Sequence, residues 1–234
     1  MNSDHLSSRL KTVAGYVKKN SRLADIGSDH AYLPIWLAKN NIINFGIAGE
    51  VVRGPYQNAK NEISKAGLNN TILPRLADGL AAIEASDHID TITIAGMGGT
   101  LISQILDSGV DKLKNVQNLI LQPNVGEKIL REWLMHNGYK IVDEQILAED
   151  RHTYEVIVAE PVNDKITYSD KELTFGPFLV NNPNEVFYQK WRSEKQQLEN
   201  VLKQIETSKK PNIDKIDELN HQIKQINEVI GNES

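Results

Sequence analysis

The feature that most constrains the fold is an alternation of short apolar runs with amphipathic helical stretches, from Arg22 to about Pro161. This alternation is typical of βα units and a mostly parallel sheet. Each apolar run opens into a turn containing Gly, Pro or Asp, so we predict five parallel strands, each followed by a helix. The predicted strands are Arg22–Ile26, Phe45–Glu50, Ile72–Leu76, Ile89–Ala95 and Asn118–Gln122.

After Tyr139 the pattern changes to two extended runs, Lys140–Leu147 and Tyr154–Ala159. The connection between them is too short to hold a crossover helix, so these runs should pair as antiparallel strands. A parallel α/β sheet that ends in a hairpin resembles the Rossmann-like class I methyltransferases more than the dinucleotide dehydrogenases. Fold alone does not decide the chemistry, which has to be argued from the site.

The C-terminal part of the chain carries two helical stripes of apolar residues with spacings of three and four. Lys209, Lys210, Pro211 and Asn212 separate the stripes, which predicts an antiparallel two-helix coiled coil used for packing. We therefore expect a catalytic α/β domain at 1–160, and a linker followed by a helical coiled-coil domain at 161–234. The stripes are Val186, Phe187, Trp191, Leu198, Val201, Leu202 and Ile205, then Ile213, Ile216, Leu219, Ile223, Ile226 and Ile230.

Composition removes several mechanisms. The chain has no cysteine, which excludes zinc–thiolate clusters, iron–sulfur clusters and thiol nucleophiles, and no histidine has a metal-ligand spacing. We therefore expect no metal cofactor. No stretch approaches the roughly 18 uncharged apolar residues that a membrane span needs, so we expect a cytoplasmic protein without membrane contact.

The formal net charge of −5 argues against a protein that simply coats nucleic acid. The N-terminal segment is an exception, because in residues 1–22 the basic residues outnumber the single acid, Asp4. This predicted helix either contacts RNA phosphates or is a solvated surface, and the charges alone do not separate the two. The basic residues are Arg9, Lys11, Lys18, Lys19 and Arg22.

The turn after the first strand has the sequence Asp25-Ile26-Gly27-Ser28-Asp29-His30. Gly27 permits a tight turn and a close approach of the backbone to a ligand. A dinucleotide site needs further glycines, one of them where Asp29 stands. An acid there repels pyrophosphate but suits a cationic sulfonium and ammonium. The alternative is an ordinary strand-to-helix turn.

Two more acids follow the next two strands. Glu50 lies 25 residues after Asp25, which is about the offset of an acid that accepts hydrogen bonds from ribose hydroxyls. Asp78 precedes Gly79 and could accept from an adenine amino group, or it could simply cap a helix. Glu50 could likewise be a solvated strand end. Acids at three successive strand ends together predict a site for a nucleotide-like cofactor.

The fourth and fifth strands end in polar or glycine-rich loops. Gly96-Met97-Gly98-Gly99 lacks the lysine of a phosphate-binding P-loop. Its missing side chains permit a close approach of cofactor and acceptor, or the glycines could simply fit a tight turn. Met97 offers a polarizable contact to a flat base. Gln122 and Asn124 could read the edge of a nucleobase or merely form a turn.

Together these motifs resemble one family, the bacterial tRNA adenine-N1 methyltransferases of the TrmK type, which modify adenine 22. The resemblance runs nearly end to end, and the run Asp25–Pro34 is its most specific part. It implies S-adenosylmethionine as the cofactor, held by Gly27, Glu50, Asp78 and the Gly96–Gly98 loop, and tRNA as the partner, held in part by the coiled coil. The matching stretches are Leu6–Leu10, Ala24–Pro34, Ala77–Leu80, Ile94–Gly99 and Leu121–Asn124.

We therefore expect a monomer that transfers a methyl group in line to a flipped-out adenine. Asp29 is the candidate catalytic group, because methylation leaves a positive charge on the ring that a carboxylate stabilises. It could serve the base, the cofactor or both. The expected cofactor site comprises Asp25, Gly27, Ser28, Asp29, His30, Glu50, Val51, Asp78, Gly79, Gly96, Met97 and Gly98. The expected RNA contacts are Arg9, Lys11, Lys18, Lys19, Gln122 and Asn124.

Two other functions fit part of the pattern. The protein could methylate a small molecule, in which case the coiled coil would serve dimerisation. It could also be a non-catalytic scaffold that binds the cofactor, although Asp29, Glu50 and Asp78 argue against this reading.

Overall fold

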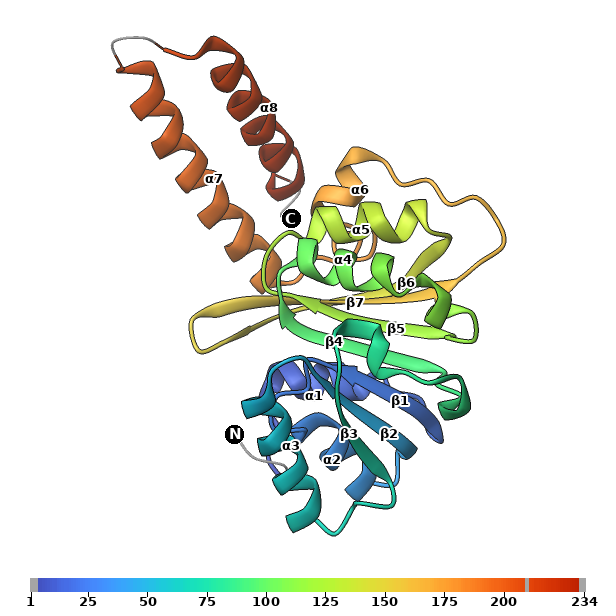
Figure 1. Ribbon diagram of the computed structural model, residues 1–234. Helices are drawn as coiled ribbons and strands as arrows, with labels where there is room; N and C mark the ends of the chain where they lie inside the picture. The colour runs from blue at the N-terminus through green and yellow to red at the C-terminus, as the bar shows by residue number, and fades with distance from the viewer. Residues whose placement is uncertain (1–3, 209–210, 232–234) are drawn as a thin grey trace.

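A seven-stranded mixed sheet forms the centre of the protein (Figure 1), and the computed structural model describes residues 4–208 and 211–231. The strand order is β3-β2-β1-β4-β5-β7-β6, with β1 to β5 parallel and β7 antiparallel to both of its neighbours. This confirms the predicted α/β fold with a terminal hairpin. The strands are β1 (Ser21–Ile26), β2 (Ile43–Glu50), β3 (Ile72–Leu76), β4 (Thr91–Met97), β5 (Asn118–Pro123), β6 (Tyr139–Glu149) and β7 (His152–Pro161).

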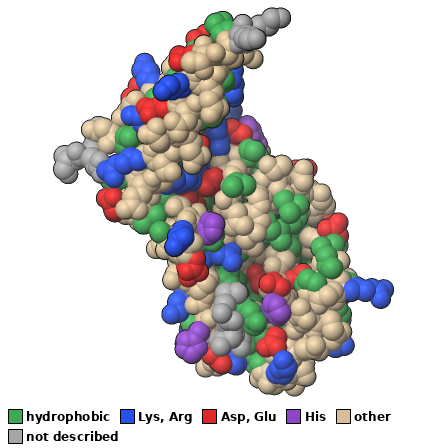
Figure 2. Space-filling view, turned by 90° about the vertical axis from the view of Figure 1, so that its left-hand side faces the viewer, with side chains coloured by type: hydrophobic (Ala, Val, Ile, Leu, Met, Phe, Trp, Pro, Cys, Tyr) green, Lys and Arg blue, Asp and Glu red, His purple; other side chains and the backbone are tan. Residues whose placement is uncertain are grey.

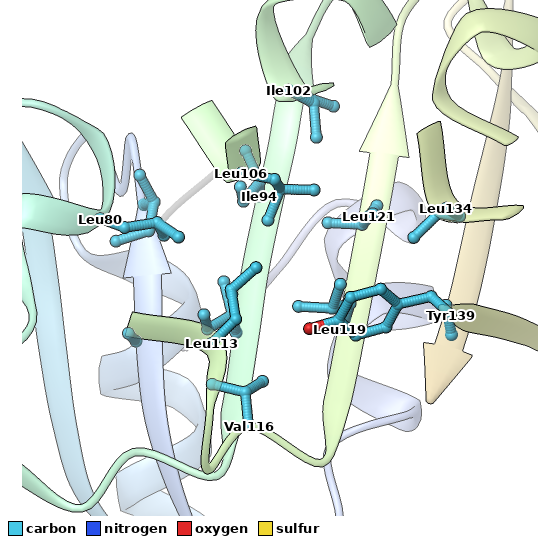
Figure 3. Packing of buried hydrophobic residues seen from close by; sticks show 14 of the residues in the cluster. Leu80, Ile94, Ile102, Leu106, Leu113, Val116, Leu119, Leu121, Leu134 and Tyr139 are labelled. Atoms are coloured by element: carbon cyan, nitrogen blue, oxygen red, sulfur yellow. The ribbon is translucent and has the colours of Figure 1, made fainter. Parts of the chain in front are cut away.

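Helices cover both faces of the sheet, so the central strands are buried on both sides. Leu119 and Leu121 of β5 pack against α4 (Gly99–Ser108) and α5 (Glu127–His136), and Figure 3 shows Ile102, Leu106 and Leu134 closing this core. On the other face, Ile120 packs with α1 (Ser8–Gly15) and α2 (Tyr32–Lys39). Next to it, α3 (Arg53–Lys65) covers β2 and β3. Alternate side chains of one strand therefore join different layers.

The expectation that a helix follows each strand is wrong after β3. Only two short 3-10 helices, η1 (Gly79–Ala82) and η2 (Ala85–Asp87), link β3 to β4. Buried Asp87 pairs with the guanidinium of Arg75 in β3 and also accepts from the backbone N–H of Glu84. These bonds hold a compact connection in place of an α-helix.

The N-terminal helix is shorter than its basic charges suggested. Helix α1 includes Arg9 and Lys11, while Lys18 and Lys19 lie in the turn that follows it. Arg22 belongs to β1, where its guanidinium lies 4.2 Å from the centre of the Phe45 ring. The predicted continuous basic helix is therefore a basic segment spread over three kinds of structure.

The C-terminal part consists of α6 (Asp170–Phe175), α7 (Glu185–Glu206) and α8 (Ile213–Ile230). Helices α7 and α8 run side by side in opposite directions and project from the domain as an arm, which we call the helical arm (Figure 1). This agrees with the predicted antiparallel pair, of which Lys209 and Lys210 lie outside the described residues. Short helix α6 was not predicted, because its six residues are too few for a periodic pattern.

A buried network of charges fixes the base of the helical arm to the domain. Arg131 of α5 has no exposed surface, and its guanidinium pairs with Glu144 of β6 and Glu155 of β7. The ammonium of Lys190 in α7 lies 2.7 Å from carboxylate oxygens of both Glu127 and Glu155. Burial opposes ionisation of Glu155, but Arg131 and Lys190 hold the pKa of its carboxyl below the usual value. The arm is therefore anchored through paired charges.

Within the described residues, 4–208 and 211–231, no helix combines the length and the apolar character required to cross a membrane.

Candidate cofactor and substrate site

The loop after β1 is built around Gly27 and the buried carboxylate of Asp25. Gly27 has a φ of +72°, and the backbone N–H groups of Gly27 and Ser28 both donate to the carbonyl oxygen of Gly49. Asp25 accepts from the hydroxyls of Ser28 and Thr93 at 2.5 and 2.7 Å, and burial raises the pKa of its carboxyl. Asp25 thus braces the loop from beneath, as its hydrogen bonds are made within the chain.

Glu50, at the end of β2, faces the same loop. Its carboxylate accepts from the backbone N–H of Asp29, and only 7% of the residue is exposed. Burial raises the pKa of Glu50 to about 7, and the negative charges of Asp25 and Asp29 act in the same direction. The Asp29 side chain is 68% exposed, with one carboxylate oxygen 3.7 Å from Nε2 of His30. Asp29 therefore presents its charge outward while its backbone is held by Glu50.

A cavity of about 240 Å³ opens between this loop, α1 and the end of β4. Asp25, Gly27, Ser28 and Asp29 line one side of it, and Gly96 and Met97 line another. The Met97 side chain lies over Gly27, because a Cβ atom added to Gly27 would come within 2.1 Å of the Met97 terminal methyl. A side chain at Gly27 would therefore displace the flexible end of Met97, and the positive φ is what favours glycine at this position.

Arg9 also lines this cavity, although the sequence placed it among the RNA contacts. Its Nη1 donates to Oε1 of Gln122 at 2.5 Å, and its guanidinium lies 5.3 Å from the centre of the Tyr154 ring. The carboxylate of Glu149 accepts from the backbone N–H groups at the start of α1, Ser8 and Arg9. These contacts hold a cation in a cavity whose other charged residues are acids.

Asp78 and Gly79 line a second cavity of about 290 Å³, between η1 and α4. Asp78 occupies the N-cap position of η1, yet its side chain makes no capping hydrogen bond. Of the two roles considered for Asp78, the structure thus disfavours capping and leaves the carboxylate exposed toward the solvent. Val51, which directly follows Glu50, is 62% exposed and lies at the same edge of the sheet.

The loops after β4 and β5 are tied together by hydrogen bonds. Gln122 is fully buried, and its Oε1 accepts from the backbone N–H of Gly96 at 3.0 Å as well as from Arg9. Its Nε2 donates to Oδ1 of Asn124, whose Nδ2 donates to the carbonyl oxygen of Gly96. This arrangement favours the structural role for Gln122, since both ends of its amide are used within the chain.

The expected cofactor residues therefore gather along one edge of the sheet, whereas the basic residues do not form one cluster. Lys11 lies at the rim of a different cavity, Lys18 pairs with Glu160, and Lys19 is exposed in the turn after α1.

Tyr32 lines the first cavity and stacks on His30 with ring centres 5.0 Å apart. Sequence reasoning missed Tyr32, because only the fold brings the start of α2 beside Arg9.

The residues present suit S-adenosylmethionine. Carboxylates at Asp29, Glu50 and Asp78 match a ligand with a cationic sulfonium, ribose hydroxyls and an adenine amino group, and Arg9 matches its carboxylate. Among the residues the structure describes, no group of three or more His, Cys, Asp or Glu side chains is arranged to hold a metal ion. The fold and this edge of the sheet define a Rossmann-like, S-adenosylmethionine-dependent methyltransferase.

The family follows from comparison with known proteins. The model of the TrmK family, tRNA (adenine(22)-N(1))-methyltransferase, matches residues 23–228, and the chain belongs to this family. The tRNA (adenine(22)-N(1))-methyltransferase of Bacillus subtilis is 43% identical over 236 residues, covering 98% of this chain and 99% of that protein.

Two solved structures carry the cofactor or its product. Streptococcus pneumoniae Sp1610 in complex with S-adenosyl-L-methionine is 45% identical and superposes with a TM-score of 0.89 over 97% of this chain and 100% of that one. M. capricolum TrmK in complex with S-adenosyl-homocysteine is 31% identical, with a TM-score of 0.87 over 97% of this chain and 98% of that one.

Proposed function

We propose that this protein transfers the methyl group of S-adenosylmethionine to N1 of adenine 22 in tRNA. The observation that carries the proposal is the acidic edge of the sheet, with Asp29, Glu50 and Asp78 following three adjacent parallel strands. Membership in the TrmK family supports the substrate. The Bacillus subtilis relative is a tRNA (adenine(22)-N(1))-methyltransferase, and the Streptococcus pneumoniae relative binds S-adenosyl-L-methionine, which supports both the reaction and the cofactor.

In the proposed site Glu50 and Asp78 each have one task toward the cofactor. Ionised Glu50 accepts from the ribose hydroxyls, and Asp78 accepts from the adenine amino group. Arg9 neutralises the carboxylate of the methionine tail from the first cavity, which revises its expected role as an RNA contact. Gly27 and the Gly96–Gly98 loop let the backbone of the chain turn tightly beside the cofactor.

Bound in this site, S-adenosylmethionine supplies an electrophilic methyl carbon. The lone pair of adenine N1 is already available at neutral pH, so the chain has mainly to orient the base for in-line attack. Such orientation supplies roughly 7–11 kcal/mol in favourable cases. Methylation leaves a positive charge on the ring, and exposed Asp29 is placed at the cavity to stabilise it as it develops.

The basic residues and the helical arm complete the proposed tRNA surface. Lys11 and Lys19 extend the N-terminal basic segment beyond the cavity, and Lys18 adds its charge beside Glu160. Figure 2 shows Lys and Arg side chains on the helical arm, interspersed with acids. We retain the division into a catalytic domain at 1–160 and a linker with a coiled coil at 161–234. We also propose a cytoplasmic monomer.

The decisive experiment incubates the protein with bacterial tRNA and labelled S-adenosylmethionine, and maps reverse-transcription stops afterwards. We expect incorporation of label and one new stop at position 22, because an N1-methyl group blocks base pairing. The Asp29→Asn variant tests the catalytic assignment, with slower methylation and near-normal cofactor binding expected. Methylation of small molecules in place of tRNA, together with a dimer that needs residues 185–234, would instead support the small-molecule enzyme.

A further inference from the structure

An exposed apolar side chain stands at the tip of the turn between β5 and α5. Val125 is 67% exposed, the largest exposed fraction among the large apolar side chains of the described residues. The turn lies beside the Gly96–Gly98 loop of the proposed cofactor site, since a Cβ atom on Gly98 would lie 3.8 Å from a methyl group of Val125. An exposed apolar side chain therefore stands next to the loop that we propose holds the cofactor.

The backbone on both sides of Val125 is fixed. Its carbonyl oxygen accepts from the N–H of Gly99, and the N–H of Asn124 donates to the carbonyl oxygen of Met97, both at 2.7 Å. The next residue, Gly126, has a φ of +78°, and a Cβ atom on Gly99 would come within 2.1 Å of its carbonyl oxygen. Val125 is thus presented on a rigid turn.

A rigid apolar tip suits an RNA with an extruded base. Adenine N1 lies on the edge used for base pairing, so the base must leave its stack before the methyl group can reach it. Proteins that unstack bases often insert an apolar side chain into the step that opens. We propose that Val125 is such a positioning residue: it fills the gap left by the target adenine and keeps the base in the site. The inference rests on the proposed function.

The test compares Val125→Ala with Val110→Ala. Val110 is a matched control because it is 57% exposed and lies in η3 (Val110–Leu113), which follows the opposite end of α4. Steady-state kinetics would use folded tRNA and a tRNA that is abasic opposite the target adenine, in which extrusion is easier. On folded tRNA we expect V125A to lower kcat/KM about tenfold, because a smaller apolar side chain then fills the opened base step, with cofactor affinity unchanged. The abasic tRNA should restore most of the loss, and V110A should behave as wild type.

A second readout follows extrusion without methylation. With 2-aminopurine at the target position, wild type should raise the fluorescence on binding, and V125A should bind but raise it less. Equal fluorescence for V125A and wild type, or an equal kinetic loss on both tRNAs, would overturn the proposal. If wild type itself transfers no methyl group to tRNA, the proposed function fails. If wild type is active and V125A matches it, only the role of Val125 fails.

Discussion

The raised pKa of Glu50 makes cofactor binding sensitive to pH near neutrality. Burial raises this pKa to about 7, whereas the usual value is 4.5. A protonated carboxyl loses the charge that favours hydrogen bonds from ribose hydroxyls, so S-adenosylmethionine should bind the ionised form. Binding should therefore release a proton, and affinity should fall as the pH is lowered.

The size of the effect follows from the fraction of ionised Glu50. With a pKa of about 7, this fraction is roughly 90% at pH 8 and roughly 10% at pH 6, so the apparent Kd should rise about tenfold between these values. Tenfold corresponds to about 1.4 kcal/mol of binding free energy. The sign for folding is opposite: because the folded pKa lies above the unfolded one, the unliganded protein loses stability as the pH rises from 4.5 to about 7.

Isothermal titration calorimetry at several pH values measures this effect, and buffers with different ionisation enthalpies report the released proton. Glu50→Gln should bind the cofactor more weakly and with little pH dependence between pH 6 and 8. Glu62→Gln is the control, since Glu62 pairs with Lys65 on the surface of α3. A wild-type Kd that is constant from pH 6 to 8 would refute the reasoning, as would an unchanged pH dependence in E50Q.

Three further variants test the site and its support. Gly27→Ala should weaken cofactor binding about tenfold, because alanine adopts a φ of +72° only with strain; Gly15→Ala, with no neighbour within 4 Å, should bind normally. Arg131→Met should lower the free energy of unfolding by about 3–5 kcal/mol in denaturant titrations, because the buried carboxylates of Glu144 and Glu155 then lose the guanidinium that pairs with them. Adding E144Q and E155Q to this variant should recover part of the lost stability. Arg9→Ala should raise the Kd for S-adenosylmethionine about tenfold, the loss of one charge-assisted bond, while the KM for tRNA stays within twofold; the reverse pattern would return Arg9 to the RNA surface.

The local elements of the fold could be read from the sequence because their causes are local. The alternation of apolar runs and turns predicted all five parallel strands to within about two residues, and the short connection at 148–153 predicted the antiparallel hairpin. The left-handed backbone at Gly27 favours a glycine, so the loop after β1 could be recognised from the sequence as part of the cofactor site. The acids after β1, β2 and β3 could be grouped because the carboxyl ends of parallel strands share one edge.

Other features were decided by contacts between distant parts of the chain. The insertion of β7 between β5 and β6 is a matter of strand pairing that periodicity does not encode. The sequence suggested that Arg9 is a surface charge. In the structure its backbone N–H donates to Glu149 and its guanidinium donates to Gln122, so that Arg9 lines the first cavity. The ion pairs of Arg131 with two buried carboxylates join α5, β6 and β7. In the sequence these three residues look like ordinary surface charges, because nothing local shows that they are buried together.

The sequence by itself thus determined the type and order of most elements, the cofactor loop and the family, since hydrophobic period, turn chemistry and a specific ten-residue run are all properties of neighbouring residues. Only the tertiary structure decided which charges are buried in pairs, which basic residue reaches the cofactor cavity, and that Val125 stands exposed on a rigid turn. The physical reason is that burial and pairing depend on which surfaces meet, and those surfaces come from residues far apart in the chain.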